Sequence, residues 1–519
     1  MALLLDYFSA IASTTMITAL IILLLLRNKP AAATSRSHLP RKLPPGPRKL
    51  PVIGNLHQLI GKLPHRGLRD LAHKHGPHVM GLQLGELPYI VISSPEAAGE
   101  VMKAHDPSFA TRPRLLLSDV VFYGAKDIGL APYGSHWRQL RKICVVELLS
   151  SKRVLSFRPV RESEAAKLVA AVVSAGAGCV DVGKLLRSST SSLVFRAAFG
   201  MAASDTEAKF TEIISRVSSG FAVSNLFPSV KFLPALTGYR SCLTKLHLAA
   251  DGMLEAIINE HKARRRNICA GSEAASDRNC YSEDLVDILL NLQDDGSHEL
   301  NFPLTTEAIK AVILDIFIGG IETGSTTLEW IMSELMRHPS VMRKAQDEVR
   351  RTFRGRVNVG EEDVGSLTYL DLVIQESLRL HPPLPLLLPR EARERVEILG
   401  YEIPSQTKVI VNAWAIGRDP RAWKEADKFI PERFLDRPND SKGNNLEFIP
   451  FGFGRRMCPG MSFGLATVKL MLTNLLYHFN WKLPSGITHE NFDMTERAGV
   501  GLRRYHSLHL IPVAYDAML

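Results

Sequence analysis

The chain has few cysteines, six among 519 residues. Their positions in the sequence show no paired spacing. A secreted protein held by disulfides carries cysteines at paired spacings. The sequence therefore favours a reducing compartment. Internal repeats are also missing, so nothing divides the chain into similar units.

Acidic residues are absent from the segment that follows the apolar stretch at residues 3–26. Residues 27–49 carry seven cations and no acid, and without them the formal net charge of +10 falls to +3. The remaining chain lacks the strong positive charge of a nucleic-acid-binding protein, so we expect no nucleic-acid partner. A positive segment beside a bilayer is attracted to anionic lipid headgroups.

Residues 3–26 are apolar except for Asp6 and a few hydroxyl groups, and they are long enough to span a bilayer as a helix. A cleaved signal peptide is the alternative, and residues 31–33 could form its cleavage site. However, no basic residue precedes the apolar run, and the run is longer than a signal peptide needs. The cations that follow it predict a cytosolic position for the rest of the chain.

The basic and Pro-rich residues 27–50 predict a semi-rigid linker between this anchor and a globular body. In that body, residues 79–84 and 89–92 predict a β-hairpin. Helical patterns dominate from residue 140 to residue 380, and a polar stretch at 264–282 predicts a surface loop. We therefore expect a fold that is mostly α with a small β region.

Cys458 ends the stretch Phe451-Gly-Phe-Gly-Arg-Arg-Met-Cys458, and Pro459 and Gly460 follow before a predicted helix. Gly454 and Gly460 allow backbone conformations that other residues avoid, so N–H groups can turn toward the sulfur. Phe451 would shield the sulfur from water, and Arg456 could meet an anionic group. A lone cysteine is more often a buried structural residue, but these neighbours favour an iron-bound thiolate.

This stretch resembles the haem-binding loop of the cytochrome P450 superfamily, F-x-x-G-x-R-x-C-x-G, at every fixed position. The resemblance implies that Cys458 is the axial ligand of the iron in haem b, whose thiolate favours O–O cleavage. It also implies the cytochrome P450 fold, with residues 51–519 forming one large haem-thiolate monooxygenase domain behind the anchor.

A second group of residues lies in a helix predicted over 306–338, with Thr306 as its cap and Pro339 after its end. Gly319 and Gly320 each lower helix stability by about 1 kcal/mol relative to alanine. They share one face with Thr323. That face could admit a flat cofactor or a close helix crossing, and the residues alone leave both open.

The segment Gly319-Gly-Ile-Glu-Thr323 resembles the oxygen-activation motif of the superfamily. The resemblance implies that Gly320 lies against the cofactor and that Glu322 and Thr323 deliver protons to dioxygen. Glu322 stands where aspartate is more frequent, and Gly324 stands where a hydroxyl residue is common.

Glu376 and Arg379 lie three residues apart in an apolar helix and can form an ion pair. The resemblance adds Arg433 as a third member of a structural network that holds the cysteine loop in place. It also implies a set of residues that bind the haem propionates. These are Trp137, Arg141, Arg390 and Arg456.

His381-Pro-Pro383 and residues 412–420 resemble the plant microsomal branch, in particular its A-type terpenoid hydroxylases. The likeness implies the endoplasmic reticulum membrane, with a single-pass N-terminal anchor and a catalytic domain facing the cytosol. It implies that one oxygen atom of O2 enters a C–H bond, with electrons passed from NADPH by NADPH–cytochrome P450 reductase. Cytochrome b5 could be an additional partner.

The segments that border the pocket in this family correspond to mostly apolar residues. They favour a small but bulky apolar substrate, such as a sesquiterpene or diterpene of plant specialised metabolism. A phenylpropanoid or alkaloid precursor is the alternative, and some of these residues could belong to the core instead. The predicted pocket residues are Phe122, Phe317, Ile318, Leu386, Leu387, Ala498 and Val500.

Two other functions compete with the monooxygenase. A haem-thiolate isomerase or dehydratase would use a peroxide and no reductase, and it would not need the acid and threonine found here. A haem sensor or binding protein without activity would need neither that pair nor an apolar pocket. The sequence favours the monooxygenase.

Overall fold

The computed structural model describes residues 42–176, 178–200, 205–218, 222–270, 283–294, 303–356, 359–435, 445–497, 499 and 501–515. The predicted anchor at 3–26 and most of the predicted linker at 27–50 lie outside these ranges. Within them, no helix combines the length and the apolar character needed to cross a bilayer.

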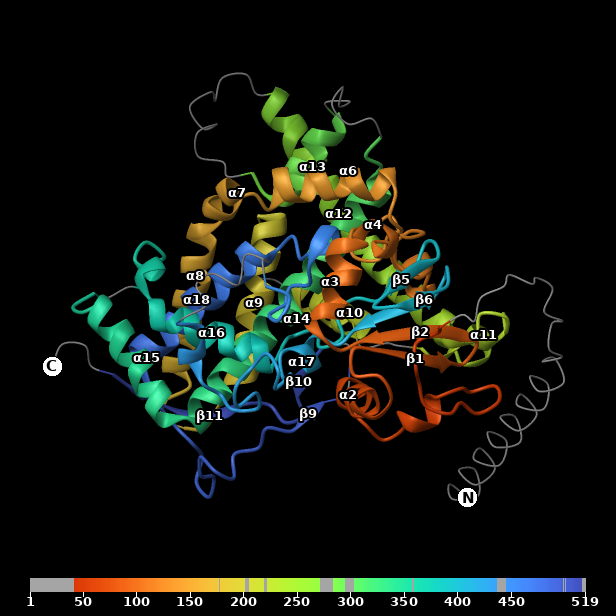
Figure 1. The fold of residues 1–519 in the computed structure, drawn as a ribbon. Coiled ribbons are helices and arrows are strands. Elements are labelled where there is room, and N and C mark those ends of the chain that lie inside the picture. Colours follow the sequence, from red (N-terminus) through yellow and green to blue (C-terminus); the bar gives the residue numbers. More distant parts are fainter. Residues whose placement is uncertain are drawn as a thin grey trace, which may run out of the picture.

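Helices form most of the described chain, and the largest sheet lies at one side of them (Figure 1). The helices are α2 (Pro64–His75), α3 (Pro95–Gly99), α4 (Asp106–Phe109), α5 (Leu116–Val120), α6 (Ser135–Ile143), α7 (Ser151–Ser156), α8 (Arg158–Ser174), α9 (Val182–Phe199), α10 (Asp205–Ser218), α11 (Leu233–Leu236), α12 (Tyr239–Ala270), α13 (Leu285–Asp294), α14 (Thr306–Arg337), α15 (Pro339–Thr352), α16 (Thr368–Leu380), α17 (Ala413–Ile416) and α18 (Met461–His478). The strands are β1 (Val79–Leu84), β2 (Leu87–Ile92), β3 (Val180–Asp181), β4 (Arg390–Glu391), β5 (Val396–Ile398), β6 (Tyr401–Ile403), β7 (Lys408–Val411), β8 (Phe479–Lys482), β9 (Glu496–Arg497), β10 (Arg503–Arg504) and β11 (His509–Ala514).

The predicted hairpin is present as β1 and β2, which pair antiparallel with Leu84 opposite Leu87. Gly85, in the turn between them, has a left-handed φ of 59°, which glycine adopts without steric penalty. The sheet order is β1-β2-β7-β4, with β2 and β7 parallel. Smaller sheets join β3-β11-β8, β9-β10 and β5-β6.

Helix α14 runs through the centre of the helical body (Figure 1). Its N-cap is Thr305, whose hydroxyl accepts the Ala308 N–H at 3.2 Å, and not the predicted Thr306. Residues 308–314 and 325–336 are buried, whereas Gly319 at the middle is exposed. The middle of this helix is therefore accessible, although the segments on both sides of it are packed into the protein.

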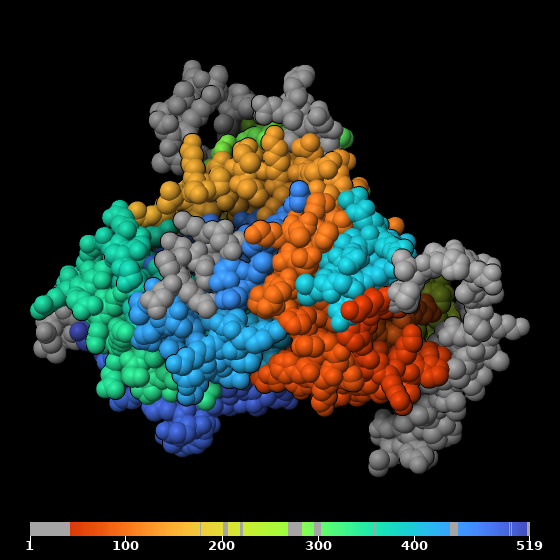
Figure 2. Space-filling view, viewed as in Figure 1, coloured from red at the N-terminus to blue at the C-terminus, as the bar shows by residue number. Residues whose placement is uncertain are grey.

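The predicted surface loop at 264–282 is partly wrong, because α12 continues as a helix to Ala270. Residues 253–270 contain no proline or glycine that would end the helix before that point. On the face shown in Figure 2, residues near 100 lie beside residues between 390 and 460. A bridge between Thr111 and Glu391 joins these two distant parts of the chain.

Candidate functional site

The loop before α18 requires glycine at two positions. Gly452 and Gly454 have φ values of 71° and 72°, in the left-handed region. A Cβ on Gly454 would also lie 2.4 Å from the carbonyl oxygen of Met102. Gly460 differs from the prediction, since its φ of −89° is open to any residue. A Cβ there would meet no atom within 4 Å, so its absence leaves space beside Cys458.

Cys458 is held by its own loop. Its N–H donates to the Phe451 carbonyl at 2.9 Å, and the Gly460 N–H donates to the sulfur. Burial raises the pKa of the Cys458 thiol, while the Gly460 N–H and Arg141 act in the opposite direction. The side chain is nevertheless accessible. A desolvated yet accessible thiol can reach a bound group, and a bound metal ion is what would make it a thiolate.

The two glycines of α14 have different surroundings. A Cβ on Gly320 would lie 2.9 Å from Cγ2 of Val194 on α9, whereas a Cβ on Gly319 would meet no atom within 4 Å. The missing side chain of Gly320 is therefore explained by the crossing of α9 and α14. Gly319, and not the predicted Gly320, is the glycine that leaves open space.

Thr323 and Glu322 follow that glycine and have separate partners. The Thr323 hydroxyl donates to the Gly319 carbonyl, one turn earlier. Glu322 forms an ion pair with Arg503 of β10. Arg503 was not among the predicted site residues, because nothing in the sequence relates β10 to α14.

Arg141 of α6 is the predicted propionate ligand whose charge has no local partner. Burial lowers the pKa of Arg141, and the Cys144 and Cys458 thiols act in the opposite direction. Within the described ranges, no hydrogen bond or ion pair to its guanidinium is found. A desolvated cation without a counter-ion is unfavourable, so an anionic group is expected beside it.

The other predicted propionate ligands have partners within the protein. The Trp137 indole N–H donates to the Ile128 carbonyl at 3.0 Å, so its one donor is already used. Arg390 of β4 pairs with Asp106 at 3.0 Å and donates to the Phe453 carbonyl at 2.8 Å. No pattern in the sequence indicates Asp106, which also accepts the Arg455 N–H at 3.0 Å.

Arg456 is buried over the Trp137 ring, with 4.1 Å between its Cζ and the ring centroid. Its guanidinium donates to three backbone carbonyls, those of Ala110 at 2.7 Å, Ile128 at 3.0 Å and Ala131 at 2.5 Å. These contacts anchor the cysteine loop to residues 110–131. The polar groups of these three side chains are therefore bonded within the protein, and they differ in this from Arg141.

The predicted network of Glu376, Arg379 and Arg433 is brought together and buried. Arg379 Nε lies 2.7 Å from one Glu376 oxygen, and Arg433 Nε lies 3.0 Å from the other. Arg379 also donates to the Gly417 and Ala426 carbonyls at 2.5 and 2.6 Å. Such additional hydrogen bonds are what a buried ion pair requires.

The predicted pocket residues divide into core and border positions. Phe317 is fully buried among Phe195, Phe199 and Phe210, with 4.7 Å between the Phe210 and Phe317 ring centroids. Its placement in the pocket is therefore wrong, because its side chain packs toward α9 and α10. Phe122 is also buried in the main core.

Three other predicted pocket residues, Ile318, Leu386 and Leu387, are only partly buried. Ile318 packs against the main core, and Leu386 packs against a second cluster that contains Phe227. Leu387 has a left-handed φ of 51°, which is uncommon for a residue with a Cβ. Its side chain packs with a third cluster, which includes Phe453. Ala498 and Val500 lie outside the described residues.

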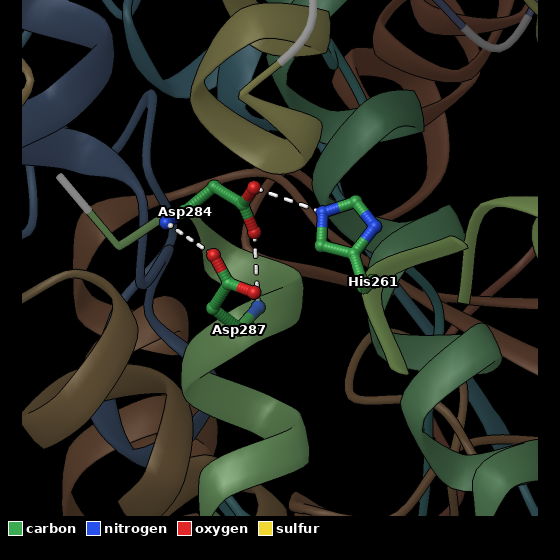
Figure 3. Close-up of side chains that lie close together, drawn as sticks. All are labelled: His261, Asp284 and Asp287. Atoms are coloured by element: carbon green, nitrogen blue, oxygen red, sulfur yellow. Dashed lines mark hydrogen bonds and ion pairs between the residues drawn. The ribbon is translucent and has the colours of Figure 1, made fainter. Parts of the chain in front are cut away.

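His261, Asp284 and Asp287 also lie close together (Figure 3), with spacing that could suit a metal ion. However, His261 contacts an Asp284 oxygen at 2.9 Å and the Ile257 carbonyl at 2.8 Å, so both ring nitrogens face acceptors. Arg264 lies 3.3 Å from Asp287. A protonated histidine and an arginine already neutralise these carboxylates, and the group is an ion-pair clip between α12 and α13.

The residues around Cys458 fit the expected haem. The Cys458 side chain is accessible, a Cβ on Gly319 or on Gly460 would meet no atom within 4 Å, and Arg141 needs an anion. A thiolate ligand, space for a flat ring and a cation for its carboxylates are the donor set that haem requires. Cys458 would hold the iron, and Arg141 would face a propionate.

Comparisons with known proteins identify the family of this chain. A family model described as cytochrome P450 matches residues 44–509. Desmethyl-deoxy-podophyllotoxin synthase of Sinopodophyllum hexandrum is 50% identical over 497 residues, which cover 95% of each chain. Premnaspirodiene oxygenase of Hyoscyamus muticus is 49% identical over 479 residues, which cover 92% of this chain and 93% of that one.

The fold is similar to that of a zebra fish cytochrome P450 solved with abiraterone. The TM-score is 0.72 at 24% identity, over 87% of this chain and 99% of the other. This likeness concerns the fold alone, while the relatives with about half their residues identical come from plants. Together with the Cys458 loop, these matches show that the chain belongs to the cytochrome P450 family, in its plant A-type branch.

Proposed function

We propose that this chain is a membrane-anchored monooxygenase that oxidises a bulky apolar small molecule, with a sesquiterpene or diterpene as the leading substrate class. Membership of the family brings haem, dioxygen and electrons supplied by a reductase. NADPH as the electron source is part of the proposal. When bound, the haem supplies the oxidation chemistry, and the protein positions the substrate.

The observation that carries the proposal is the setting of Cys458. Its sulfur accepts the Gly460 N–H and is accessible, and the open position at Gly319 of α14 is proposed to border the same internal space. Arg141 stands nearby without an anionic partner among the described residues. A thiol at a surface or in a filled core would have none of these features.

Thr323 and Glu322 are the groups proposed to handle protons. The Thr323 hydroxyl donates to the Gly319 carbonyl, so its oxygen remains free to accept a hydrogen bond from water in the adjacent space. Glu322 is an ionised acceptor held in place by Arg503. A hydroxyl and a carboxylate on successive residues can pass a proton through one water molecule.

The substrate class is supported by the residues near this space. Leu116, Leu117, Ile316 and Ile318 are partly buried and pack against the main core. Apolar side chains of this kind favour a hydrocarbon over an anionic acid or a sugar. Premnaspirodiene oxygenase, whose name gives a diene as its substrate, is one of the relatives.

The proposed location is the endoplasmic reticulum membrane, with residues 3–26 as the anchor and the catalytic domain in the cytosol. The apolar length of this segment and the seven cations that follow it support this position. Lipid headgroups and cytochrome b5 are proposed as additional partners. NADPH–cytochrome P450 reductase is proposed as the electron donor.

The test is an assay of the full-length protein with reductase, NADPH and two substrate sets. One set holds sesquiterpenes and diterpenes, and the other holds phenylpropanoid and alkaloid precursors. We expect a terpenoid product that carries one oxygen from labelled O2 and that is not formed without NADPH. Products only from the second set would change the substrate class. Conversion of a peroxide without reductase would identify an isomerase instead.

A further inference from the structure

Residues 127–131, which follow α5 in the chain, form a short loop that contacts both α14 and the cysteine loop. The carboxyl groups of Asp315 and of the buried Asp127 accept hydrogen bonds from N–H groups of this loop. Oδ2 of Asp315, on α14, accepts the N–H groups of Ile128 at 2.5 Å and Gly129 at 3.0 Å. Oδ2 of Asp127 accepts the Leu130 N–H at 2.6 Å. Three successive N–H groups are thus fixed by carboxyl oxygens.

The carbonyl groups of the same loop face the other way, toward the cysteine loop. Arg456 donates to the Ile128 carbonyl at 3.0 Å and to the Ala131 carbonyl at 2.5 Å. The Gly129 carbonyl accepts Nε of the buried Arg112 at 2.9 Å. Asp315 of α14 thus holds the N–H groups of the 127–131 loop. The carbonyl groups of that loop in turn determine where the Arg456 guanidinium lies.

We propose that Asp315 is a positioning residue for Cys458, acting through the 127–131 loop and Arg456. Arg456 lies two residues before Cys458, and its guanidinium makes hydrogen bonds only to backbone carbonyls within the described chain. The helix on one side of the internal space thereby holds the loop on the other. This inference rests on the proposed function, because it assumes that Cys458 binds the haem iron.

The crowding of the two acids supports this role. A Cβ on Gly129 would lie 3.1 Å from Oδ1 of Asp315 and 3.6 Å from Oδ2 of Asp127, so both carboxyl groups press on this glycine. Burial raises the pKa of Asp127 to about 6 and raises that of Asp315 well above its ordinary value. Arg112 and Arg456 lower the pKa of Asp127. A neutral Asp315 would still accept both N–H groups.

The test compares two substitutions of Asp315 in the full-length haem protein. Asp315→Asn keeps a carbonyl oxygen that can accept the Ile128 and Gly129 N–H groups, whereas Asp315→Leu removes it. The measurement is the rate at which the reduced CO complex changes from the red-shifted thiolate band to an unshifted band. We expect the rate to rise roughly tenfold in Asp315→Leu, because two hydrogen bonds are lost, and to change less than about twofold in Asp315→Asn.

Thr305→Ala is the matched control, because it removes the N-cap of the same helix without touching the 127–131 loop. It should lower the melting temperature and leave the spectral rate unchanged. A second control asks whether the effect passes through Arg456. In a protein that already carries Arg456→Lys, Asp315→Leu should increase the rate of the spectral change little further. The reason is that both substitutions interrupt the same chain of hydrogen bonds.

Three outcomes would overturn the inference. They are an Asp315→Leu protein with the wild-type rate, an equal loss in Thr305→Ala, and full additivity with Arg456→Lys. If Asp315→Leu cannot hold haem at all, Gly129→Ala is the milder variant, and the same comparison is made with it. Absence of the red-shifted band from the wild-type protein would instead refute the proposed function, so the two failures are distinguishable.

Discussion

At the scale of single residues, Thr323 is the side chain best placed to report on proton delivery. Its hydroxyl donates to the Gly319 carbonyl beside the open space, whereas the similar Thr327 is buried and donates to the Thr323 carbonyl at 2.8 Å. The two threonines lie one turn apart on α14. One of them can reach water in the space, and the other cannot.

We expect Thr323→Val to keep the haem and the red-shifted CO band but to divert most NADPH electrons to hydrogen peroxide. Product formed per NADPH should fall at least about tenfold, since positioned proton transfer is worth more than that. Thr327→Val is the control and should leave the ratio of product to NADPH unchanged. Equal ratios in Thr323→Val and the wild type would mean that this face only packs against the cofactor.

Arg503 provides a second prediction at this scale, because it forms the ion pair with Glu322. Arg503→Met should leave the half-buried Glu322 carboxylate without its counter-ion. It should therefore impair proton delivery to the same extent as Glu322→Gln. The double variant should be no worse than either single one. The measurement is peroxide released per NADPH. Arg497, the cross-strand partner of Arg503, is exposed and serves as the control; an equal effect of Arg497→Met would contradict the assignment.

At the scale of elements, the paired glycines of α14 make a prediction about stability. Gly319→Ala should raise the free energy of unfolding by up to about 1 kcal/mol, because alanine favours helix and its Cβ meets no atom. Gly320→Ala should lower it, because the Cβ would press on Val194. Adding Val194→Ala should recover part of that loss. Similar melting temperatures for the two glycine variants would contradict the division of roles.

The ion-pair clip between α12 and α13 predicts a dependence of stability on pH. Burial acts to lower the pKa of His261, but the hydrogen bond to Asp284 prevails and raises it. A histidine whose pKa is raised by folding stabilises the protein below its unfolded pKa, near 6.5, and loses this effect as the pH rises through the folded value.

Compared with His261→Gln, the wild-type protein should be more stable at pH 6 by about 1.5–3 kcal/mol, the range of a hydrogen bond to a charged group. The difference should shrink as the pH rises toward 9. Thermal unfolding across this pH range measures it. A difference that grows with pH would show that the His261 ring is neutral in the folded protein.

At the scale of the whole molecule, the cysteine loop could be predicted from sequence because its function depends on neighbouring residues. Gly454 and Cys458 stand at fixed spacings, and the β1–β2 hairpin follows from local alternation and Gly85. Helix α12 extends to Ala270, although a loop is predicted from residue 264, because a polar helical stretch and a polar loop have similar composition. Phe317 was misplaced because periodicity does not separate a core face from a pocket face.

The residues that sequence did not predict act across long distances in the chain. Asp106 meets Arg390, Asp315 meets Ile128, and Glu322 meets Arg503. Charged residues of this kind are common on surfaces, so type and spacing alone cannot pick them out. Only the packing of α4 against β4, and of α14 against the 127–131 loop and β10, reveals them.

The central claim is that Cys458 is the thiolate ligand of a haem iron. The most direct measurement is the absorption spectrum of the reduced, undenatured full-length protein with CO. We predict the strongly red-shifted Soret band of a thiolate-bound haem, absent from Cys458→Ser and retained in Cys144→Ser, whose thiol is buried in the main core. An unshifted band in fresh wild-type protein, or a red-shifted band that survives in Cys458→Ser, would contradict the claim.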